Sequence, residues 1–367
     1  MRRPFVMWAV FALCAALPCA FGQSPDNSAD KSAGPTLTPT PEQLRQQAKV
    51  HNVPEIPYEP VAGLFKMPPG LYMGEAMGVA TNSKGHVFVF TRSAATRLFE
   101  FDQNGRYVRE MGRGLYGFVF AHSVRVDAHD NVWVVDEGSN MAIEFDPRGR
   151  VAMVIGRRAA AIDGVPEMGP GGLTPANPVP QPYVLDRPTD IGWDAAGNIF
   201  IADGYGNSRV VKYDPDGHFV AQTAGPGTGP GQMHLPHSLQ VDRAGNVYVA
   251  DRSNYRIQVL DNDLKYKTEY TSVGQPWTLC ISSGPHQYLY SSNSYPDQNN
   301  SVVKPFSGEI YKMELDGTVL GRFGKPGKQP GEFSTTHGID CRNDGQLYIS
   351  EITSWRVQKI LLGKVRP

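Results

Sequence analysis

Two copies of one short unit stand next to each other between Gly197 and Asp261, and they constrain the fold more than any other feature of the chain. The copies read GNIFIADGYGNSRVVKYD and GNVYVADRSNYRIQVLD. In each copy a Gly-Asn turn precedes an apolar run that ends in Ala-Asp, and an Asn-x-Arg step opens a second alternating run. This pattern indicates a repeat architecture, in which each unit packs against its neighbours.

Related units follow one another from about Gly78 to Ile360. Six can be recognised, and each offers about four short alternating strands joined by Asp-Gly or Asn-Gly turns. The first begins near Gly78, and the others begin at His122, Pro188, Pro236, Pro276 and His337. We therefore predict an all-β fold, a six-bladed β-propeller.

Two segments need a separate interpretation within this fold. The sixth unit ends before its outermost strand, so we expect Val61 to Lys66 to complete that blade, close the ring and cover its edges. The Pro/Gly-rich segment from Arg157 to Arg187 is predicted to be a long loop between the second and third blades.

The residues before the propeller divide into two parts. Residues 1–22 have the pattern of a signal peptide: Arg2 and Arg3, an apolar run and a small-x-small site before Gln23. Residues 23–57 are rich in Ser, Pro, Thr and Gln, which predicts a flexible tether with a short helix around Glu42 to Lys49. Residues 58–367 form the predicted propeller. We expect an exported protein, periplasmic or secreted, with no membrane span after signal removal, and a monomer because a closed ring satisfies its own edges.

Composition limits the partners and leaves the cysteines open. The net charge is −1, so nothing indicates nucleic acid or an anionic membrane surface as a partner. Cys14 and Cys19 would leave with the signal peptide, which leaves Cys280 and Cys341. An exported compartment permits a bridge between them, but we expect free buried thiols.

Three of the nine histidines lie at the same offset in alternate units: His122, His237 and His337. Each begins the first strand of its unit, and first strands line the central channel of a propeller. We therefore expect the three side chains to meet near the axis. Three neutral imidazoles with an open fourth position are what a catalytic zinc ion requires. For a single histidine, filling the channel is the better interpretation, but three matched offsets favour a metal site.

The remaining histidines do not share this offset. We expect them to be solvated, except that His234 could line the mouth of the site; they are His51, His86, His129, His218, His234 and His286.

The ends of the second strands carry a further set of polar side chains. Arg92, Tyr205 and Arg252 occupy this position in the first, third and fourth units, at the same end as the histidines. A tyrosine near a bound cation and arginines would have its pKa drawn down from about 10, which suits a general base. Arginines there suit a substrate carboxylate. The structural alternatives are loop packing for the tyrosine and ion pairs between blades for the arginines.

Arg209 and Arg256 stand in the Asn-x-Arg steps and are better interpreted as structural. We expect each to reach back to an aspartate such as Asp203 or Asp251.

The motifs DGYGNSR (residues 203–209), LPHSL (235–239) and ADRSNYRIQ (250–258) resemble those of peptidyl-α-hydroxyglycine α-amidating lyase, a family of NHL-repeat six-bladed propellers. The family cleaves an α-hydroxyglycine into an amide and glyoxylate. The resemblance implies that His122, His237 and His337 are zinc ligands and that Tyr205 is the catalytic tyrosine. It implies that Arg92 and Arg252 are active-site arginines, and that the substrate is a small molecule or peptide with a hydroxyglycine end.

The chain departs from the family at several positions. The family has an aspartate directly after the third ligand, where this chain has Gly338, so the family's structural Ca²⁺ remains an open expectation. Gly206 replaces a cysteine after the tyrosine, and no copper monooxygenase domain accompanies the propeller, so another N-acyl or N-carbamoyl hydroxyglycine is an alternative substrate.

Two alternative functions remain open from the sequence. One is a non-catalytic NHL propeller that acts as a periplasmic binding module. The other is a calcium-dependent lactonase-type propeller, which would place acidic and amide side chains around the axis in place of the histidines.

Overall fold

The structure is a computed structural model that describes residues 40–50, 52–158, 168–169, 172–173, 181–293 and 307–363. By its contacts the chain divides into two units, Met1–Lys31 and Ser32–Pro367. All described residues belong to the second unit. The predicted signal peptide and the first part of the predicted tether lie outside the described residues.

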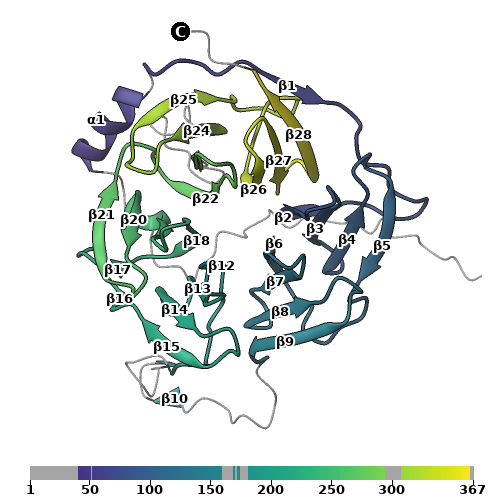
Figure 1. The fold of residues 1–367 in the computed structure, drawn as a ribbon, viewed down its shortest axis with the longest axis horizontal. Coiled ribbons are helices and arrows are strands. Elements are labelled where there is room, and N and C mark those ends of the chain that lie inside the picture. The colour runs from purple at the N-terminus through teal and green to yellow at the C-terminus, as the bar shows by residue number, and fades with distance from the viewer. Residues whose placement is uncertain are drawn as a thin grey trace, which may run out of the picture. The chain divides into compact units, whose positions relative to one another are not determined.

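Six sheets of four antiparallel strands surround a common centre in this unit (Figure 1). Blade 1 consists of β2 (Glu75–Thr81), β3 (Val87–Arg92), β4 (Arg97–Phe101) and β5 (Tyr107–Met111). Blade 2 consists of β6 (Ala121–Val126), β7 (Val132–Asp136), β8 (Met141–Phe145) and β9 (Val151–Gly156). Blade 3 consists of β12 (Asp190–Trp193), β13 (Ile199–Asp203), β14 (Arg209–Tyr213) and β15 (Phe219–Gln222).

The second half of the ring repeats this order. Blade 4 consists of β18 (Pro236–Val241), β19 (Val247–Asp251), β20 (Arg256–Leu260) and β21 (Tyr266–Tyr270). Blade 5 consists of β22 (Pro276–Ile281), β23 (Leu289–Asn293), β24 (Glu309–Met313) and β25 (Val319–Phe323). Blade 6 consists of β26 (Thr336–Asn343), β27 (Gln346–Glu351), β28 (Arg356–Leu362) and β1 (Tyr58–Val61). The predicted all-β six-bladed propeller is confirmed.

The ring closes as expected, but through residues earlier than those predicted. Strand β1 pairs with β28, with Tyr58 opposite Leu362 and Val61 opposite Lys359, so the closing strand is Tyr58–Val61 and not Val61 to Lys66. After Gly63, which adopts a positive φ of 60°, the chain turns towards blade 1. There the backbone N–H of Lys66 donates to the carbonyl of Gly105 at 2.8 Å. Residues 62–66 therefore connect blades 6 and 1.

Helix α1 (Pro41–Val50) includes the short helix expected around Glu42 to Lys49. The side-chain amide of its Gln43 donates to the carbonyl of Asn254 at 2.8 Å. Further along, Ile56 is buried among the apolar side chains of blades 5 and 6. None of the helices within the described residues has the length and apolar character that a membrane span needs.

The loops between blades carry a few short elements. Strands β10 (Met168–Gly169) and β11 (Gly172–Leu173) form a pair in the loop predicted from Arg157 to Arg187, most of which lies outside the described residues. Strands β16 (Gly225–Pro226) and β17 (Gln232–Met233) pair in parallel before blade 4, and a 3₁₀ turn, η2 (Arg252–Asn254), follows β19.

Buried arginine–carboxylate pairs stabilise the second and third strands of several blades. Arg209 donates to Asp203 at 2.9 Å and Arg256 donates to Asp251 at 2.7 Å, as expected from the Asn-x-Arg steps. The side chains of Arg209 and Asp203 are 1 % and 0 % exposed. Burial raises the pKa of Asp203 to about 6, and the charge of Arg209 opposes this shift. A pair so deeply buried must keep both members, because removal of one leaves an unpaired charge in the core.

Cys280 on β22 and Cys341 on β26 form a disulfide with 5.9 Å between their Cα atoms. The expectation of two free thiols was therefore wrong. The two residues are far apart in sequence, but they stand on the innermost strands of neighbouring blades, which lie close together near the axis. That Cα separation is within the range of a disulfide.

Candidate metal centre and active site

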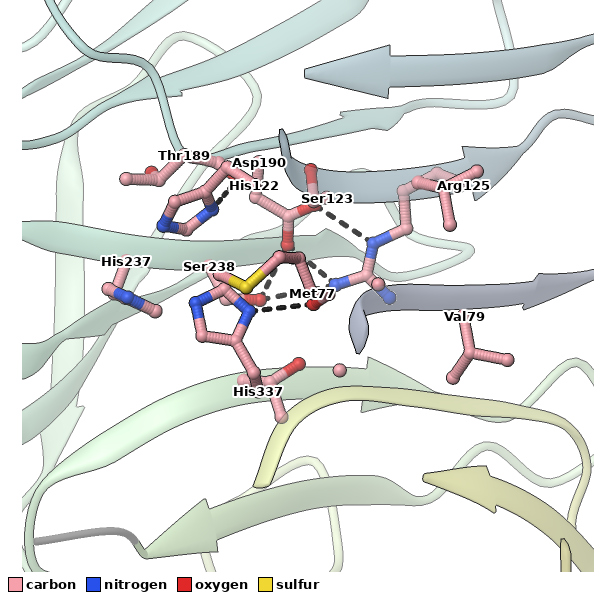
Figure 2. Close-up of a pocket in the computed structure, with 14 residues that line it drawn as sticks. Met77, Val79, His122, Ser123, Arg125, Thr189, Asp190, His237, Ser238 and His337 are labelled. Carbon is pink, nitrogen blue, oxygen red and sulfur yellow. Dashed lines mark hydrogen bonds and ion pairs between the residues drawn. The ribbon is translucent and has the colours of Figure 1, made fainter. Parts of the chain in front are cut away.

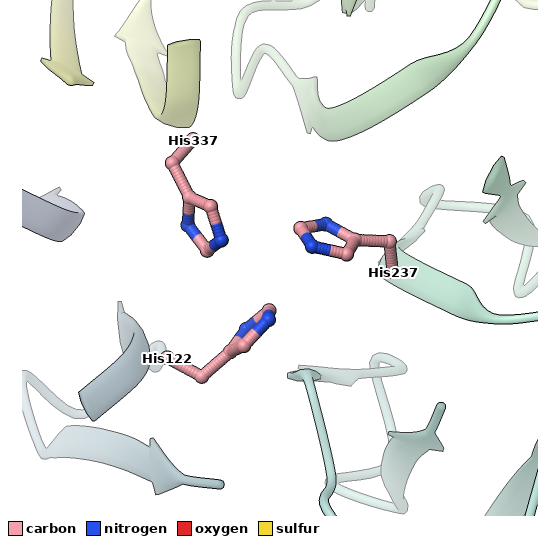
Figure 3. A group of neighbouring side chains, drawn as sticks. All are labelled: His122, His237 and His337. Atoms are coloured by element: carbon pink, nitrogen blue, oxygen red, sulfur yellow. The ribbon is translucent and has the colours of Figure 1, made fainter. Parts of the chain in front are cut away.

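A backbone irregularity directs each of the three histidines at the axis. The register between the first and second strands shifts between Ala121 and Ser123 in blade 2, so that His122 is the extra residue of a β-bulge. The same shift occurs around His237 in blade 4 and around His337 in blade 6. A bulged residue has no partner in the ladder and changes the direction of its side chain. Figure 3 shows the three rings pointing toward one another from separate blades.

The rings are close enough to share one ligand. Their centroids lie 4.6 to 4.9 Å apart, and one nitrogen of each ring lies within 4.8 Å of the others. All three residues are buried, with exposed fractions of 1 % for His122, 2 % for His237 and 6 % for His337. The structure therefore brings together the three histidines that the repeat offsets singled out.

The hydrogen bonds of the rings define which nitrogen faces the centre. Nδ1 of His122 donates to the carbonyl of Thr189 at 2.7 Å, and Nδ1 of His237 donates to that of Trp277 at 2.7 Å. Nδ1 of His337 donates to the carbonyl of Met77 at 2.7 Å, as Figure 2 shows. Because a carbonyl only accepts, Nδ1 carries the proton in each ring and Nε2 carries the lone pair.

Burial keeps the cluster neutral. The pKa of each histidine lies well below 6.5, first because the ring is buried, and then because positive charges lie nearby. Arg92 contributes to this lowering at His122 and His337, and Arg252 contributes at all three rings.

These features fit a divalent metal ion such as zinc. Zinc is bound by neutral imidazoles. The other ring nitrogen of each ligand commonly donates to a carbonyl or carboxylate, which fixes the orientation of the ring. The Nε2 atom of His122 is buried and has no hydrogen-bond partner among the described residues, which is costly for a polar atom unless a ligand binds it. A metal ion held by the three Nε2 atoms would keep further coordination positions open.

Tyr205 lies beside this cluster. Its hydroxyl is 3.2 Å from Nε2 of His237, and its ring packs edge-on against His122 and His237. Since Nε2 of His237 has no proton, the hydroxyl donates to it. The tyrosine comes from the loop after β13, at the end of the ring where the histidines begin their strands.

The two predicted arginines differ in their partners. Arg92 donates to Glu75 at 2.8 Å and stacks on the ring of Phe120 at 3.8 Å. The guanidinium of Arg252 stacks on the ring of Trp277 at 3.8 Å, which in turn contacts His237. Its Nε is buried without a hydrogen-bond partner, and within the described part of the chain it forms no ion pair. Arg252 therefore keeps a hydrogen-bond donor that no described residue uses.

Sequence reasoning missed two charged residues here, Arg187 and Glu137. The guanidinium of Arg187 stacks on the ring of Tyr205 at 4.5 Å, and its Nε donates to Glu137 at 2.9 Å. The other oxygen of Glu137 lies 4.0 Å from Arg92, so one buried carboxylate is shared by two arginines. Arg187 ends a long loop, and no other unit has an arginine at its offset, so the repeat pattern did not point to it.

The other histidines lie outside the cluster. His218 and His286 are exposed and pair with Asp214 and Glu314, in line with the expected solvation. His86 is only partly exposed, because its Nδ1 bonds to the buried Glu100 at 2.7 Å. His234 is half-buried near the site, and His51 lies outside the described residues.

Comparison with known proteins identifies relatives of the chain. The model of the NHL repeat family matches residues 233–260. Peptidyl-glycine alpha-amidating monooxygenase of Mus musculus is 28 % identical over 85 % of this chain, which spans 34 % of that protein's length. The probable peptidyl-alpha-hydroxyglycine alpha-amidating lyase pgal-1 of Caenorhabditis elegans is 25 % identical over 82 % of this chain and 85 % of the relative. NHL repeat-containing protein 3 of Homo sapiens is 27 % identical over 79 % of this chain and 80 % of the relative.

Solved structures share the fold at lower identity. Virginiamycin B lyase from Staphylococcus aureus has a TM-score of 0.55 at 13 % identity, covering 84 % of this chain and all of that one. A gluconolactonase from Xanthomonas campestris has a TM-score of 0.54 at 17 % identity, covering 85 % of this chain and 95 % of that one. These two likenesses concern the fold alone. The ring geometry, the matched NHL repeat and the sequence relatives describe the chain as a six-bladed β-propeller that is similar in sequence to peptidyl-α-hydroxyglycine α-amidating lyases.

Proposed function

We propose that this protein is a zinc-dependent lyase that cleaves the C–N bond of an N-acyl α-hydroxyglycine, giving an amide and glyoxylate. The observation that carries the proposal is the cluster of three neutral histidines with the Tyr205 hydroxyl beside it. Each imidazole has its Nδ1 proton held by a carbonyl and turns its Nε2 lone pair to the centre, where that of His237 accepts from the Tyr205 hydroxyl and could be taken up by a metal ion. A zinc ion held by His122, His237 and His337 would supply Lewis-acid activation of the substrate's hydroxyl group.

Tyr205 is the group that can move the proton. Its oxygen lies 3.2 Å from a proposed ligand nitrogen, so a hydroxyl group held at the cluster would be within its reach. We assign to this oxygen the removal of the hydroxyl proton. The electrons of the O–H bond then form the C=O bond of glyoxylate, while those of the C–N bond pass to the nitrogen, which takes a proton and becomes the amide.

Arg252 is the group that can hold the carboxylate of the hydroxyglycine. Its guanidinium has an unsatisfied Nε and is oriented by the Trp277 ring, next to His237. A planar guanidinium binds a carboxylate through paired hydrogen bonds. Arg92 is already paired with Glu75, so its role is to keep the electrostatic potential at the histidines positive.

The relatives support a peptide-like substrate. Two of them are named for the amidation of peptidyl-glycine or peptidyl-α-hydroxyglycine, and the pgal-1 relative is similar in length to this chain. Because the chain spans about a third of the monooxygenase relatives, we propose only the lyase step. The substrate is then a peptidyl or other N-acyl hydroxyglycine that a separate hydroxylation reaction supplies.

Glyoxylate release from α-hydroxyhippurate tests the proposal. Zinc-loaded protein should release glyoxylate and hold about one zinc ion per chain, whereas a His237→Ala variant should lose both. The matched control is His234→Ala, which removes a histidine three residues away that does not belong to the cluster. The proposed reaction is wrong if folded, zinc-loaded protein releases no glyoxylate above the level of His237→Ala.

The same metal analysis separates the alternatives. If the purified protein holds calcium without zinc and hydrolyses a lactone, the lactonase-type propeller is favoured; a gluconolactonase shares the fold. A folded protein that takes up neither metal would favour a binding module.

We also propose that the protein works in an oxidising compartment after export. The disulfide between Cys280 and Cys341 supports this, since such bonds persist in the periplasm and outside the cell. Recovery of the protein from the periplasmic or extracellular fraction of its host, with its first residues removed, is the expected result.

A further inference from the structure

The channel beside the histidines holds a buried arginine of its own. Arg125 lies on β6, three residues after His122, and its side chain is 12 % exposed. Its Nε and Nη2 donate to the two oxygens of Asp190 at 2.9 and 2.6 Å, as Figure 2 shows. Asp190 lies on β12 in the next blade, and its side chain is 2 % exposed.

The remaining hydrogen bonds of Arg125 reach across the channel. Nη2 also donates to Oγ of Ser238 and to the carbonyl of Leu279, each at 3.2 Å, and Nη1 donates to the carbonyl of Ile339 at 3.2 Å. One guanidinium from blade 2 is thus bonded to blades 3, 4, 5 and 6. Carboxylate, hydroxyl and carbonyl oxygens of this kind are the ligands that calcium takes in proteins.

Asp190 in blade 3 occupies the same repeat position as Gly338 in blade 6, where the resemblance expects an aspartate. Asp190 pairs with Ala202 and follows Thr189, and Gly338 pairs with Ser350 and follows His337, so the two residues are equivalent in the repeat. The resemblance expects an aspartate at Gly338, and this chain carries its aspartate at the equivalent position on the opposite side of the ring.

A side chain at Gly338 would also be crowded. A Cβ atom there would lie 2.6 Å from Oγ of Ser350, which can rotate away, and 3.2 Å from the backbone Cα of Gly78, which would have to give by a few tenths of an ångström. An acidic side chain at Gly338 would therefore need its neighbours to shift, and Asp190, the one carboxylate among the described residues that line this cavity, is already paired with Arg125.

We propose that the guanidinium of Arg125 is the resident cation of the channel and takes the place of a structural calcium ion. Arg125 fills the point at which oxygens from four blades converge, and Asp190 balances its charge. The protein then takes one divalent metal ion, at the histidines, and no calcium ion in the channel. This inference does not depend on the reaction, because it concerns the channel alone.

Metal content and thermal unfolding of the purified protein test the inference without any activity assay. Wild-type protein should contain no bound calcium after dialysis against calcium-containing buffer, and excess calcium should not shift its unfolding midpoint. Arg125→Ala should unfold several degrees lower, because it leaves Asp190 buried without a counter-ion. Excess calcium should restore part of that loss.

The matched control is Arg109→Ala. Arg109 also pairs with a carboxylate, that of Glu100, and with two carbonyls of the next blade, but it lies on the outermost strand of blade 1. If Arg125→Ala does not fold, Asp190→Asn with Arg125 intact gives the second comparison, and it should also unfold below the control. The inference fails if wild-type protein holds about one calcium ion per chain whose chelation lowers the unfolding midpoint. It also fails if Arg125→Ala and Asp190→Asn are no less stable than Arg109→Ala.

Discussion

The three buried histidines make the stability of the metal-free protein depend on pH in a way that the structure allows us to calculate. Each ring keeps its proton on Nδ1 and presents Nε2 to a centre from which solvent is excluded. The charge of Arg252 adds to the effect of burial at all three rings and that of Arg92 at His122 and His337, so the pKa of each histidine in the folded protein lies well below 6.5.

The sign of the effect follows from proton counting. In the unfolded chain the histidines take up protons as the pH falls through about 6.5, while in the folded protein they remain neutral, so stability decreases with falling pH. From about pH 7.5 to about pH 5.5, each histidine that stays neutral in the folded state lowers the free energy of unfolding by about 1.4 kcal/mol. The three together should lower it by about 4 kcal/mol.

Urea unfolding of metal-free wild type and of a His237→Gln variant measures this contribution. Glutamine does not titrate, so the variant should lose about 1.4 kcal/mol less than wild type over the same pH range. The pairs His86–Glu100, His218–Asp214 and His286–Glu314 are present in both proteins and cancel in the difference. Identical pH slopes for the two proteins would refute the argument that the cluster is neutral and buried.

Three further predictions concern other buried interactions. Glu137→Gln removes the charge shared by two site arginines and should lower kcat/KM for glyoxylate release roughly tenfold, at an unchanged zinc content. Arg209→Met leaves Asp203 unpaired in the core and should lower the free energy of unfolding by about 3–5 kcal/mol, part of which Asp203→Asn in the same chain should restore. Reduction of the Cys280–Cys341 disulfide should lower the free energy of unfolding by about 2–4 kcal/mol, measured by urea unfolding with and without reductant.

The histidine cluster could be predicted from the sequence because, in a repeat protein, equal offsets along the chain become equivalent positions in space. His122, His237 and His337 share one offset in three units, and once the units form a ring, equal offsets project to equal distances from the axis. The same reasoning gave the pairs of Arg209 and Arg256 with their aspartates, since these contacts lie within one blade.

Contacts that join different blades through irregular segments could not be predicted in this way. Arg187 reaches Tyr205 from the end of a long loop, and Glu137 lies between two arginines that come from different blades. No other unit has an arginine at the position of Arg187, whereas Glu137 occupies in blade 2 the position that Arg92 and Arg252 occupy in blades 1 and 4, so the same offset contained the signal for Glu137. The disulfide was not predicted for a related reason. Whether Cys280 and Cys341 meet depends on the distance between the inner strands of two neighbouring blades, which the sequence does not give.

The hydrogen bonds of the three histidines show why the cluster uses alternate blades. The position of His122 in blade 2 is occupied by Thr189 in blade 3, and His237 and Trp277 are related in the same way in blades 4 and 5. In each case the even blade supplies the imidazole and the next odd blade supplies the carbonyl that fixes it.

Strict alternation of this kind closes on itself only in a ring with an even number of blades. In blade 6, His337 finds its carbonyl in blade 1, at Met77, so the pattern returns to its start after six units. A histidine in every blade would crowd six rings at the axis, whereas the backbone carbonyls of Thr189, Trp277 and Met77 accept from the neighbouring rings without adding further imidazoles. With six blades, one repeated position therefore provides both the three ligands and the three acceptors that orient them.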